Sequence, residues 1–140
     1  MELLAAPKFR GEKCNNPFNI DESKNKWLGK SDVETDKRLE EFDSPLYGIR
    51  AGIVLLKNYY YRYGLTTISK IYDRYAPPNE NDTEAYKAFM AERLGVGVDE
   101  EFDFEEKIFD LAKATIHMEQ GRVIYPDEMI QKAIDMALNQ

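Results

Sequence analysis

The sequence predicts an α+β fold that is mostly helical, with five helices around a long central helix and a small irregular β element on its N-terminal side. Two observations lead to this prediction. Residues 43–140 carry apolar side chains at helical spacing between glycine and proline breaks, whereas residues 1–42 mix short apolar groups with turn-forming residues. The 140 residues, 43 % hydrophobic and 32 % charged, have the size and composition of one globular domain, so we expect a single domain over 1–140.

The first 42 residues are expected to form loops and two or three short strands. Gly11, Pro17 and Gly29 interrupt any helical period in this region. The strands are predicted near residues 17–20, 26–28 and 38–42, where the apolar residues gather. These residues are Phe9, Phe18, Ile20, Trp27, Leu28, Leu39 and Phe42.

The central helix is predicted over residues 44–63. Ser44 or Asp43 is a suitable N-cap, and Pro45 fits the first helical position, where its missing N–H costs nothing. Gly64 is a natural residue to follow the last turn. One side of this segment is a continuous apolar stripe, and further tyrosines and aliphatic residues leave little polar face, which predicts a helix buried in the middle of the fold. The stripe is Leu46, Ile49, Ile53, Leu56 and Tyr60.

Four shorter helices are expected to follow. The first begins at Thr66 or Thr67 and must end before Pro77-Pro78, which cannot continue a helix. The second is predicted over 83–94 with Asp82 as its cap, and the third over 103–121 with a glycine stop. The last is predicted over 127–138. The helical region is therefore expected to fill residues 43–140.

Charge and residue counts exclude several classes of function. The net charge of −7, with no cluster of Lys and Arg, argues against a nucleic-acid partner. One cysteine and one histidine exclude a four-cysteine zinc site, and no metal or other cofactor is expected. No apolar run reaches membrane-spanning length, and the first residues lack the features of a signal peptide. We therefore expect synthesis in the cytoplasm, and these features leave the final location of the protein open.

Glu119 is the candidate catalytic residue. It lies in the last predicted helical turn before Gly121, where the partial negative charge of the helix end disfavours a carboxylate and raises its pKa. A general acid acting on a glycosidic bond needs such a shift. The alternative is an ordinary exposed glutamate near a helix end.

The sequence supports other kinds of functional site less strongly. His117 lies two residues from Glu119, so the two side chains point about 200° apart and cannot form a pair. Cys14 and His117 are only the minimum inventory of a cysteine hydrolase, and an incidental thiol is the better interpretation. The tyrosines are expected mainly in the core, although they suit a sugar-binding groove as well. The loop at residues 79–83 is either a helix cap or the rim of a substrate site.

Five short segments occur in order between residues 13 and 121. They are Asn15-Asn16-Pro17-Phe18-Asn19-Ile20, Trp27-Leu28-Gly29, Phe42-Asp43-Ser44-Pro45 with Gly48-Ile49-Arg50-Ala51, Ala76-Pro77-Pro78-Asn79-Glu80-Asn81-Asp82-Thr83 with Tyr86, and His117-Met118-Glu119-Gln120-Gly121. Together they resemble a family of phage and prophage virion-associated proteins, some of which look like lysozyme-like peptidoglycan hydrolases. The family usually has glycine in place of Phe18 and no residue at the position of Met118, so Phe18 is expected to distort a tight turn there.

The resemblance implies a phage-derived protein that degrades peptidoglycan, as a muramidase or as a lytic transglycosylase. On this hypothesis Glu119 is the general acid, Asn16, Asn19 and Asn81 contact the substrate, and Arg50 orients a carboxylate, unless Arg50 only pairs with an acid such as Asp43 or Asp82. A single glutamate suits a lytic transglycosylase better than a hydrolase with two carboxylates. The partner would then be bacterial cell-wall glycan, and the resemblance implies residence in a phage particle or delivery to the cell wall.

Two competing classes remain. One is a non-enzymatic virion structural or assembly protein, whose partners are other virion proteins and whose exposed apolar residues mark the subunit contact. The other is an inhibitor or effector-binding domain that acts through its acidic surface. These classes differ from the enzyme in what surrounds Glu119, because a general acid must open into a groove that is also lined by Asn16 or Asn81.

Overall fold

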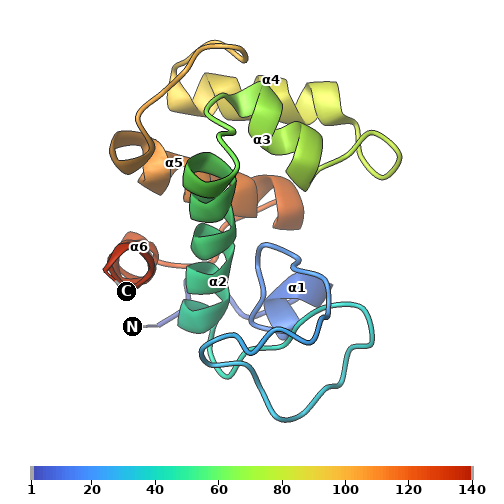
Figure 1. Ribbon diagram of the computed structural model, residues 1–140. Helices are drawn as coiled ribbons and strands as arrows, with labels where there is room; N and C mark the ends of the chain where they lie inside the picture. Colours follow the sequence, from blue (N-terminus) through green and yellow to red (C-terminus); the bar gives the residue numbers. More distant parts are fainter. Residues whose placement is uncertain (1, 140) are drawn as a thin grey trace.

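The computed structural model describes residues 2–139, whose regular secondary structure is helical (Figure 1). It consists of α1 (Arg10–Lys13), α2 (Pro45–Lys57), the π-helix η1 (Asn58–Arg62) that continues α2, α3 (Ile68–Tyr75), α4 (Thr83–Leu94), α5 (Phe104–Gln120) and α6 (Asp127–Leu138). No strand is present within this range, so the prediction of an α+β fold with a β element was wrong. Three isolated bridges are the nearest approach to a sheet, and they pair Asp21 with Leu39, Lys30 with Phe42, and Thr67 with Glu101.

The expected strands near 17–20 and 38–42 are reduced to single bridges because side chains occupy some of the backbone groups that a ladder would use, and residues 26–28 form no strand. The amide of Asn16 donates to the carbonyl oxygens of Ile20 and Glu40, at 2.9 Å each, and its oxygen accepts the N–H of Ile20. The Asp36 carboxylate accepts the N–H groups of Arg38 and Leu39. The segment is therefore an ordered loop built on polar side chains, and its apolar residues act as single anchors.

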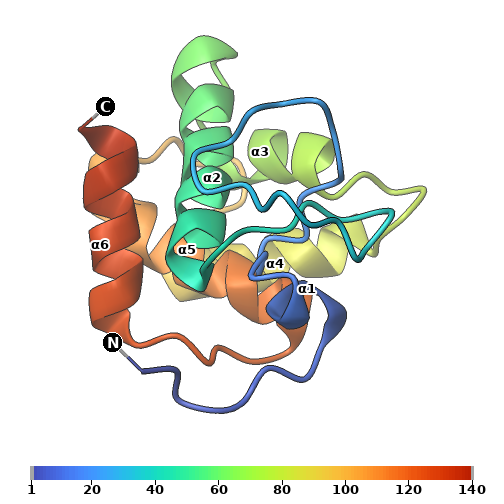
Figure 2. The same ribbon diagram turned by 90° about the horizontal axis from the view of Figure 1, so that it is seen from below.

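Helix α2 lies in the middle of the molecule, as the sequence predicts, with α6 alongside it and α5 crossing it (Figures 1 and 2). Ile49, Ile53 and Leu56 have no exposed surface. Its last turn differs from the prediction, because the backbone widens after Lys57 into η1. The N–H of Tyr63 accordingly bonds to the carbonyl of Asn58, five residues earlier.

Two glycines allow the N-terminal loop to lie directly on α2. A Cβ atom at Gly48 would lie 1.8 Å from the carbonyl oxygen of Asn15, and one at Gly52 would lie 2.2 Å from the ring of Phe18. Real Cβ atoms never approach other atoms so closely, so any other residue would push the loop away. Figure 2 shows the resulting arrangement, with the loop of residues 20–41 passing across the α2 side of the molecule.

The shorter helices begin and end at the residues that capping chemistry selects. The side chains of Thr67, Asp82 and Asp103 cap α3, α4 and α5. Gly95 and Gly121 end α4 and α5 in the left-handed conformation that glycine adopts without strain. Helix α4 packs on both α3 and α5, which places the ends of α3 and α5 on one side of the molecule.

A half-buried ion pair ties the N-terminal segment to the connection between α5 and α6. The Arg122 guanidinium donates to both carboxylate oxygens of Glu12, at 2.7 and 3.1 Å. The Glu12 side chain is fully enclosed, whereas that of Arg122 is 33 % exposed. Leu4 adds a backbone bond of 2.7 Å to Ile124. Segments more than 100 residues apart in the chain are thus held side by side.

Candidate functional site

A cleft of about 860 Å³ opens where the N-terminal loop faces the ends of α3 and α5. Its lining comes from six parts of the chain: residues 9–11, residues 18–21, the loop at 38–39, the end of α2 with the start of η1, the segment 74–81, and the last turn of α5. Both polar and apolar groups reach it. The cleft therefore combines aromatic and amide side chains with several charges, as a site for a polar polymer requires.

Glu119 lies at the wall of this cleft with both carboxylate oxygens engaged. Asn19 Nδ2 donates to Oε1 at 2.9 Å, and the Tyr86 hydroxyl donates to Oε2 at 2.7 Å. The side chain is half-buried, so the carboxyl group is fixed in orientation and still borders the open space. This arrangement meets the geometric condition for a general acid, because Asn81 also lines the cleft.

Burial controls the acidity of Glu119. Removal from water raises the pKa of this carboxyl group, while the hydrogen bonds from Tyr86 and Asn19 lower it, and the net pKa lies above that of an ordinary glutamate. Its position in the last turn of α5 also places it at the negative end of the helix dipole, as the sequence predicts. A group tuned in this way holds a proton at a pH where exposed glutamates have lost theirs.

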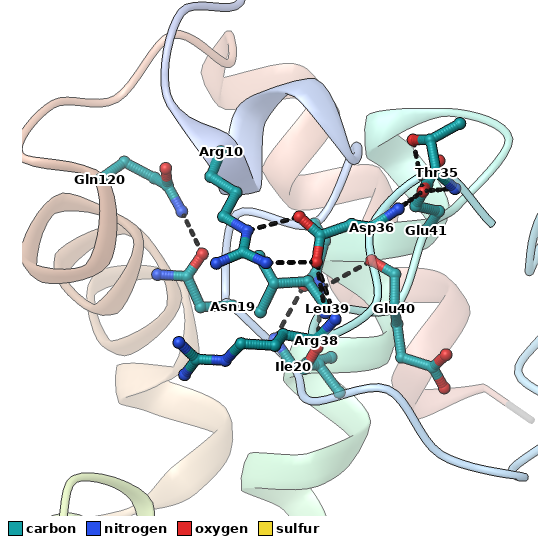
Figure 3. A network of polar contacts seen from close by, with 11 residues as sticks. Arg10, Asn19, Ile20, Thr35, Asp36, Arg38, Leu39, Glu40, Glu41 and Gln120 are labelled. Atoms are coloured by element: carbon teal, nitrogen blue, oxygen red, sulfur yellow. Dashed lines mark hydrogen bonds and ion pairs between the residues drawn. The ribbon is translucent and has the colours of Figure 1, made fainter. Parts of the chain in front are cut away.

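Asn19 is held in place for its contact with Glu119. Its backbone φ of 53° is in the left-handed region, which asparagine tolerates better than most residues. Its amide oxygen accepts a bond of 3.0 Å from Gln120, whose amide also donates to the carbonyl of Pro17. Figure 3 shows the bond between Gln120 and Asn19, with Arg10 close by and bonded to Asp36. Asn15 has the same left-handed backbone, with φ of 54°.

The sequence did not single out Tyr86 as a residue of the site. It lies on α4, and its ring stacks on that of Tyr72 at 4.9 Å between centroids. The Tyr72 hydroxyl bonds in turn to Thr115 at 2.7 Å, so a packed tyrosine column supports the hydroxyl that reaches Glu119. Aromatic residues at helical spacing are usually core, and Tyr86 is buried, so only its presence in the fourth segment of the resemblance marked it.

The other predicted site residues are divided between the cleft and the interior. Asn81 lines the cleft and is exposed, with a long contact of 3.4 Å from its amide to the carbonyl of Pro77. Asn16 is fully buried, and backbone groups of the loop use both its amide nitrogen and its oxygen. Arg50 is buried in α2 away from the cleft lining, and burial lowers its pKa.

Phe18 does not strain the loop, contrary to the expectation for this position. Its ring is buried against Gly52, and the left-handed backbone angles of the loop occur at Asn15 and Asn19 instead. The first and third segments of the resemblance therefore pack on each other. The first, fourth and last segments meet at the hydrogen bonds of Glu119.

Two alternative chemistries find no support in the geometry. Burial raises the pKa of the Cys14 thiol to about 11, which keeps it protonated. The His117 ring packs 5.3 Å from that of Phe89, on a different side of α5 from Glu119. Within residues 2–139 no group of three or more His, Cys, Asp and Glu side chains is placed to hold a metal ion.

The geometry therefore defines a helical domain with a half-buried, hydrogen-bonded glutamate at the wall of a polar cleft. No protein-family model matches the chain. The chain is 37 % identical over 129 residues to Protein P5 of Pseudoalteromonas phage PM2, and the match covers 90 % of this chain and 80 % of that protein. It therefore belongs to the same phage protein family as Protein P5 of phage PM2. Among residues 2–139, no helix has the length and apolar character needed to cross a membrane.

Proposed function

We propose that this member of a phage protein family cleaves the glycan strands of bacterial peptidoglycan, with Glu119 as the general acid. The observation that carries the proposal is a half-buried glutamate of raised pKa, oriented by Asn19 and Tyr86, at the wall of a cleft of about 860 Å³. A protonated Glu119 would donate its proton to the glycosidic oxygen as the bond to the sugar C1 breaks. Asn19 and Asn81 would hold sugar hydroxyl or acetamido groups.

The fate of the cleaved sugar depends on whether a second carboxylate takes part. Asp21 and Glu80 are exposed carboxylates that also line the cleft. If neither is needed, Glu119 would recover its proton from a hydroxyl of the same sugar, which attacks C1 and closes an internal anhydro ring, as in a lytic transglycosylase. If Asp21 is needed, a hydrolase with two carboxylates is indicated. We favour the first route, because only Glu119 is buried and oriented.

Asn16 and Arg50 have a structural part in this proposal. The amide of Asn16 replaces the missing ladder bonds of the N-terminal loop and so supports Asn19 three residues later. Arg50 stays inside α2, outside the lining of the cleft. Neither is required to touch the glycan.

The test is a turbidity assay on purified bacterial sacculi with three proteins: wild type, Glu119→Gln and Glu105→Gln. Glu105 is an exposed glutamate on the same helix, outside the cleft, and serves as the matched control. We expect wild type and Glu105→Gln to clear the suspension, and Glu119→Gln to lose at least 100-fold of the rate, about the contribution of a general acid. Equal clearing by Glu119→Gln would overturn the catalytic assignment.

The second candidate is a non-enzymatic part of the phage particle, and membership of a phage protein family is the observation that favours it. Such a protein would use its surface for contacts with other virion proteins, and the exposed tyrosines at η1, Tyr61 and Tyr63, are the side chains to examine first. A folded wild-type protein that leaves sacculi intact would decide for this candidate.

A further inference from the structure

Arg74 lies in the cleft in a position that no part of the proposed cleavage uses. It belongs to the last turn of α3, and its guanidinium stacks over two aromatic rings, 4.3 Å from the centroid of Tyr63 and 5.3 Å from that of Tyr59. Both rings come from η1 and its end, so the widened turn and α3 together hold this side chain. Aromatic stacking of this kind fixes an arginine, and although Arg74 also hydrogen-bonds to the Tyr59 side chain, its guanidinium has further N–H donors for a ligand.

The charge of Arg74 is not neutralised by a neighbouring acid. Between residues 2 and 139 no carboxylate forms an ion pair with it, and the adjacent Asp73 is bound instead to Lys87 at 2.7 Å. Arg10, which also lines the cleft, is by contrast paired with Asp36. An arginine that is fixed by aromatic rings and lacks an acidic partner is a preformed receptor for a carboxylate.

Arg74 is connected to Glu119 through a chain of aromatic contacts. The Tyr59 ring meets the Tyr75 ring at 6.5 Å, and Tyr75 meets Tyr86 at 6.5 Å. Tyr86 bonds to Glu119. Arg74, Tyr59, Tyr75 and Glu119 all line the same cleft, so a chain of sugars seated at Glu119 would extend along the tyrosines toward Arg74. The exposed charges of the cleft lining besides Arg74 and the paired Arg10 are the acids Asp21 and Glu80 and the cation Arg38.

We propose that Arg74, held between Tyr59 and Tyr63, binds a carboxylate of the substrate, so that the cleft selects glycan with acidic peptide substituents over neutral glycan. This inference rests on the proposed function for the kind of polymer. It adds the part of the polymer that the far end of the cleft recognises, namely a free carboxylate of the peptide substituent.

The test measures binding separately from cleavage. The Glu119→Gln protein, which does not turn over, is titrated with a disaccharide-peptide fragment of peptidoglycan and with chitotetraose, a neutral glycan. Arg74→Gln is added on this background. The matched control is Arg93→Gln, because Arg93 also stacks on an aromatic ring, 4.4 Å from Phe89, but lies outside the cleft.

We expect Arg74→Gln to weaken binding of the acidic fragment about tenfold, the effect of losing one charged hydrogen-bonding group, and to leave chitotetraose binding unchanged. Arg93→Gln should change neither. Equal effects of Arg74→Gln on both ligands, or no binding of the acidic fragment at all, would overturn the inference. If Arg74 governs binding but wild type leaves sacculi intact, the carboxylate site stands and the proposed cleavage fails. If wild type cleaves sacculi but binding does not depend on Arg74, the proposed cleavage stands and the carboxylate site fails.

Discussion

At the scale of single residues, the Tyr86 hydroxyl is one of two hydrogen-bond donors that lower the pKa of Glu119 against the larger effect of burial. Burial raises the pKa of Glu119, and the bonds from Tyr86 and Asn19 partly offset that effect. Tyr86→Phe removes one of these donors and so should raise the pKa of Glu119 further. Because the acid form is the active one, the alkaline limb of the pH–rate profile should move to higher pH. Tyr72→Phe, which removes a hydroxyl bonded to Thr115, should leave the limb in place.

A profile measured on sacculi, together with an NMR titration of the Glu119 carboxyl carbon, checks this prediction. The NMR measurement does not depend on activity, so it also applies if the protein proves to be non-enzymatic. A limb and a titration that stay unchanged in Tyr86→Phe would show that the hydrogen bond does not tune this carboxyl group.

The same carboxyl group makes a prediction about stability. Its raised pKa means that the folded state binds this proton more tightly than the unfolded state does, so the stability of the wild type falls as the pH rises through the folded-state pKa. Glu119→Gln removes the buried charge. Its Tm should exceed that of wild type at neutral pH, and the difference should vanish near pH 4, where the wild-type carboxyl group is protonated. Thermal unfolding at both pH values tests this, and a Tm lowered at neutral pH would contradict it.

At the scale of elements, the contact between the N-terminal loop and α2 depends on glycine. Alanine usually stabilises a helix relative to glycine by roughly 1 kcal/mol. At Gly48 the sign should reverse, because the added Cβ would lie 1.8 Å from the backbone oxygen of Asn15, which cannot rotate away. We expect Gly48→Ala to destabilise the protein by about 2 kcal/mol, as overpacking does.

Gly97→Ala is the control for this prediction, since a Cβ there meets only Glu100, at an ordinary 3.6 Å. Urea unfolding of the two variants gives the comparison. A Gly48→Ala protein as stable as wild type would mean that the loop does not lie on α2 in this way.

The elements also show what the sequence predicts and what it does not. Helices 83–94 and 127–138 have the predicted bounds because their caps and periods are local features. The predicted strands did not form because the amide of Asn16 and the carboxylate of Asp36 bind backbone groups that strand pairing would use. A local sequence pattern does not indicate such a competition. The sequence also did not predict the π-helix η1, because its residues continue the apolar pattern of α2 without a break.

At the scale of the whole molecule, the site is built from long-range contacts. Glu119 was identified from its place before Gly121, but its partner Asn19 lies 100 residues away and Tyr86 lies 33 away. The sequence placed these residues in separate segments of one resemblance and did not show that they touch. The cleft lies between the N-terminal loop and the end of α5, so it depends on the contacts that hold these two parts together.

One of these contacts is the hydrogen-bonded ion pair between Arg122 and Glu12. Burial raises the pKa of Glu12, but its bonds to Arg122 and to the N–H groups of Lys8 and Phe9 outweigh this and lower the net pKa. Arg122→Ala would leave an enclosed carboxylate without its cation, at a cost of about 3 kcal/mol. Because a lowered pKa gives stability that is lost as the pH falls, the cost of the substitution should shrink in acid, where Glu12 becomes protonated.

Urea unfolding of wild type and Arg122→Ala at neutral pH and near pH 3, below the usual glutamate pKa of about 4.3, measures this. Lys113→Ala removes an ion pair with Asp127 in which both side chains are partly exposed. This substitution should lower the free energy of unfolding by no more than about 1 kcal/mol. An equal loss of unfolding free energy in the two variants at neutral pH would contradict the claim that the Arg122–Glu12 pair stabilises the fold more than an exposed ion pair does.

The most direct test of the central claim is the mass of the fragments that the wild-type protein releases from purified sacculi. Cleavage by Glu119 between sugars predicts soluble disaccharide-peptide units, with anhydro ends, 18 Da lighter than hydrolysed ends, if the lytic route operates. Glu119→Gln should release none of them, while Glu105→Gln should release the same set as wild type. Sacculi that yield no fragments with folded wild type, or fragments cut only within the peptides, would contradict the account.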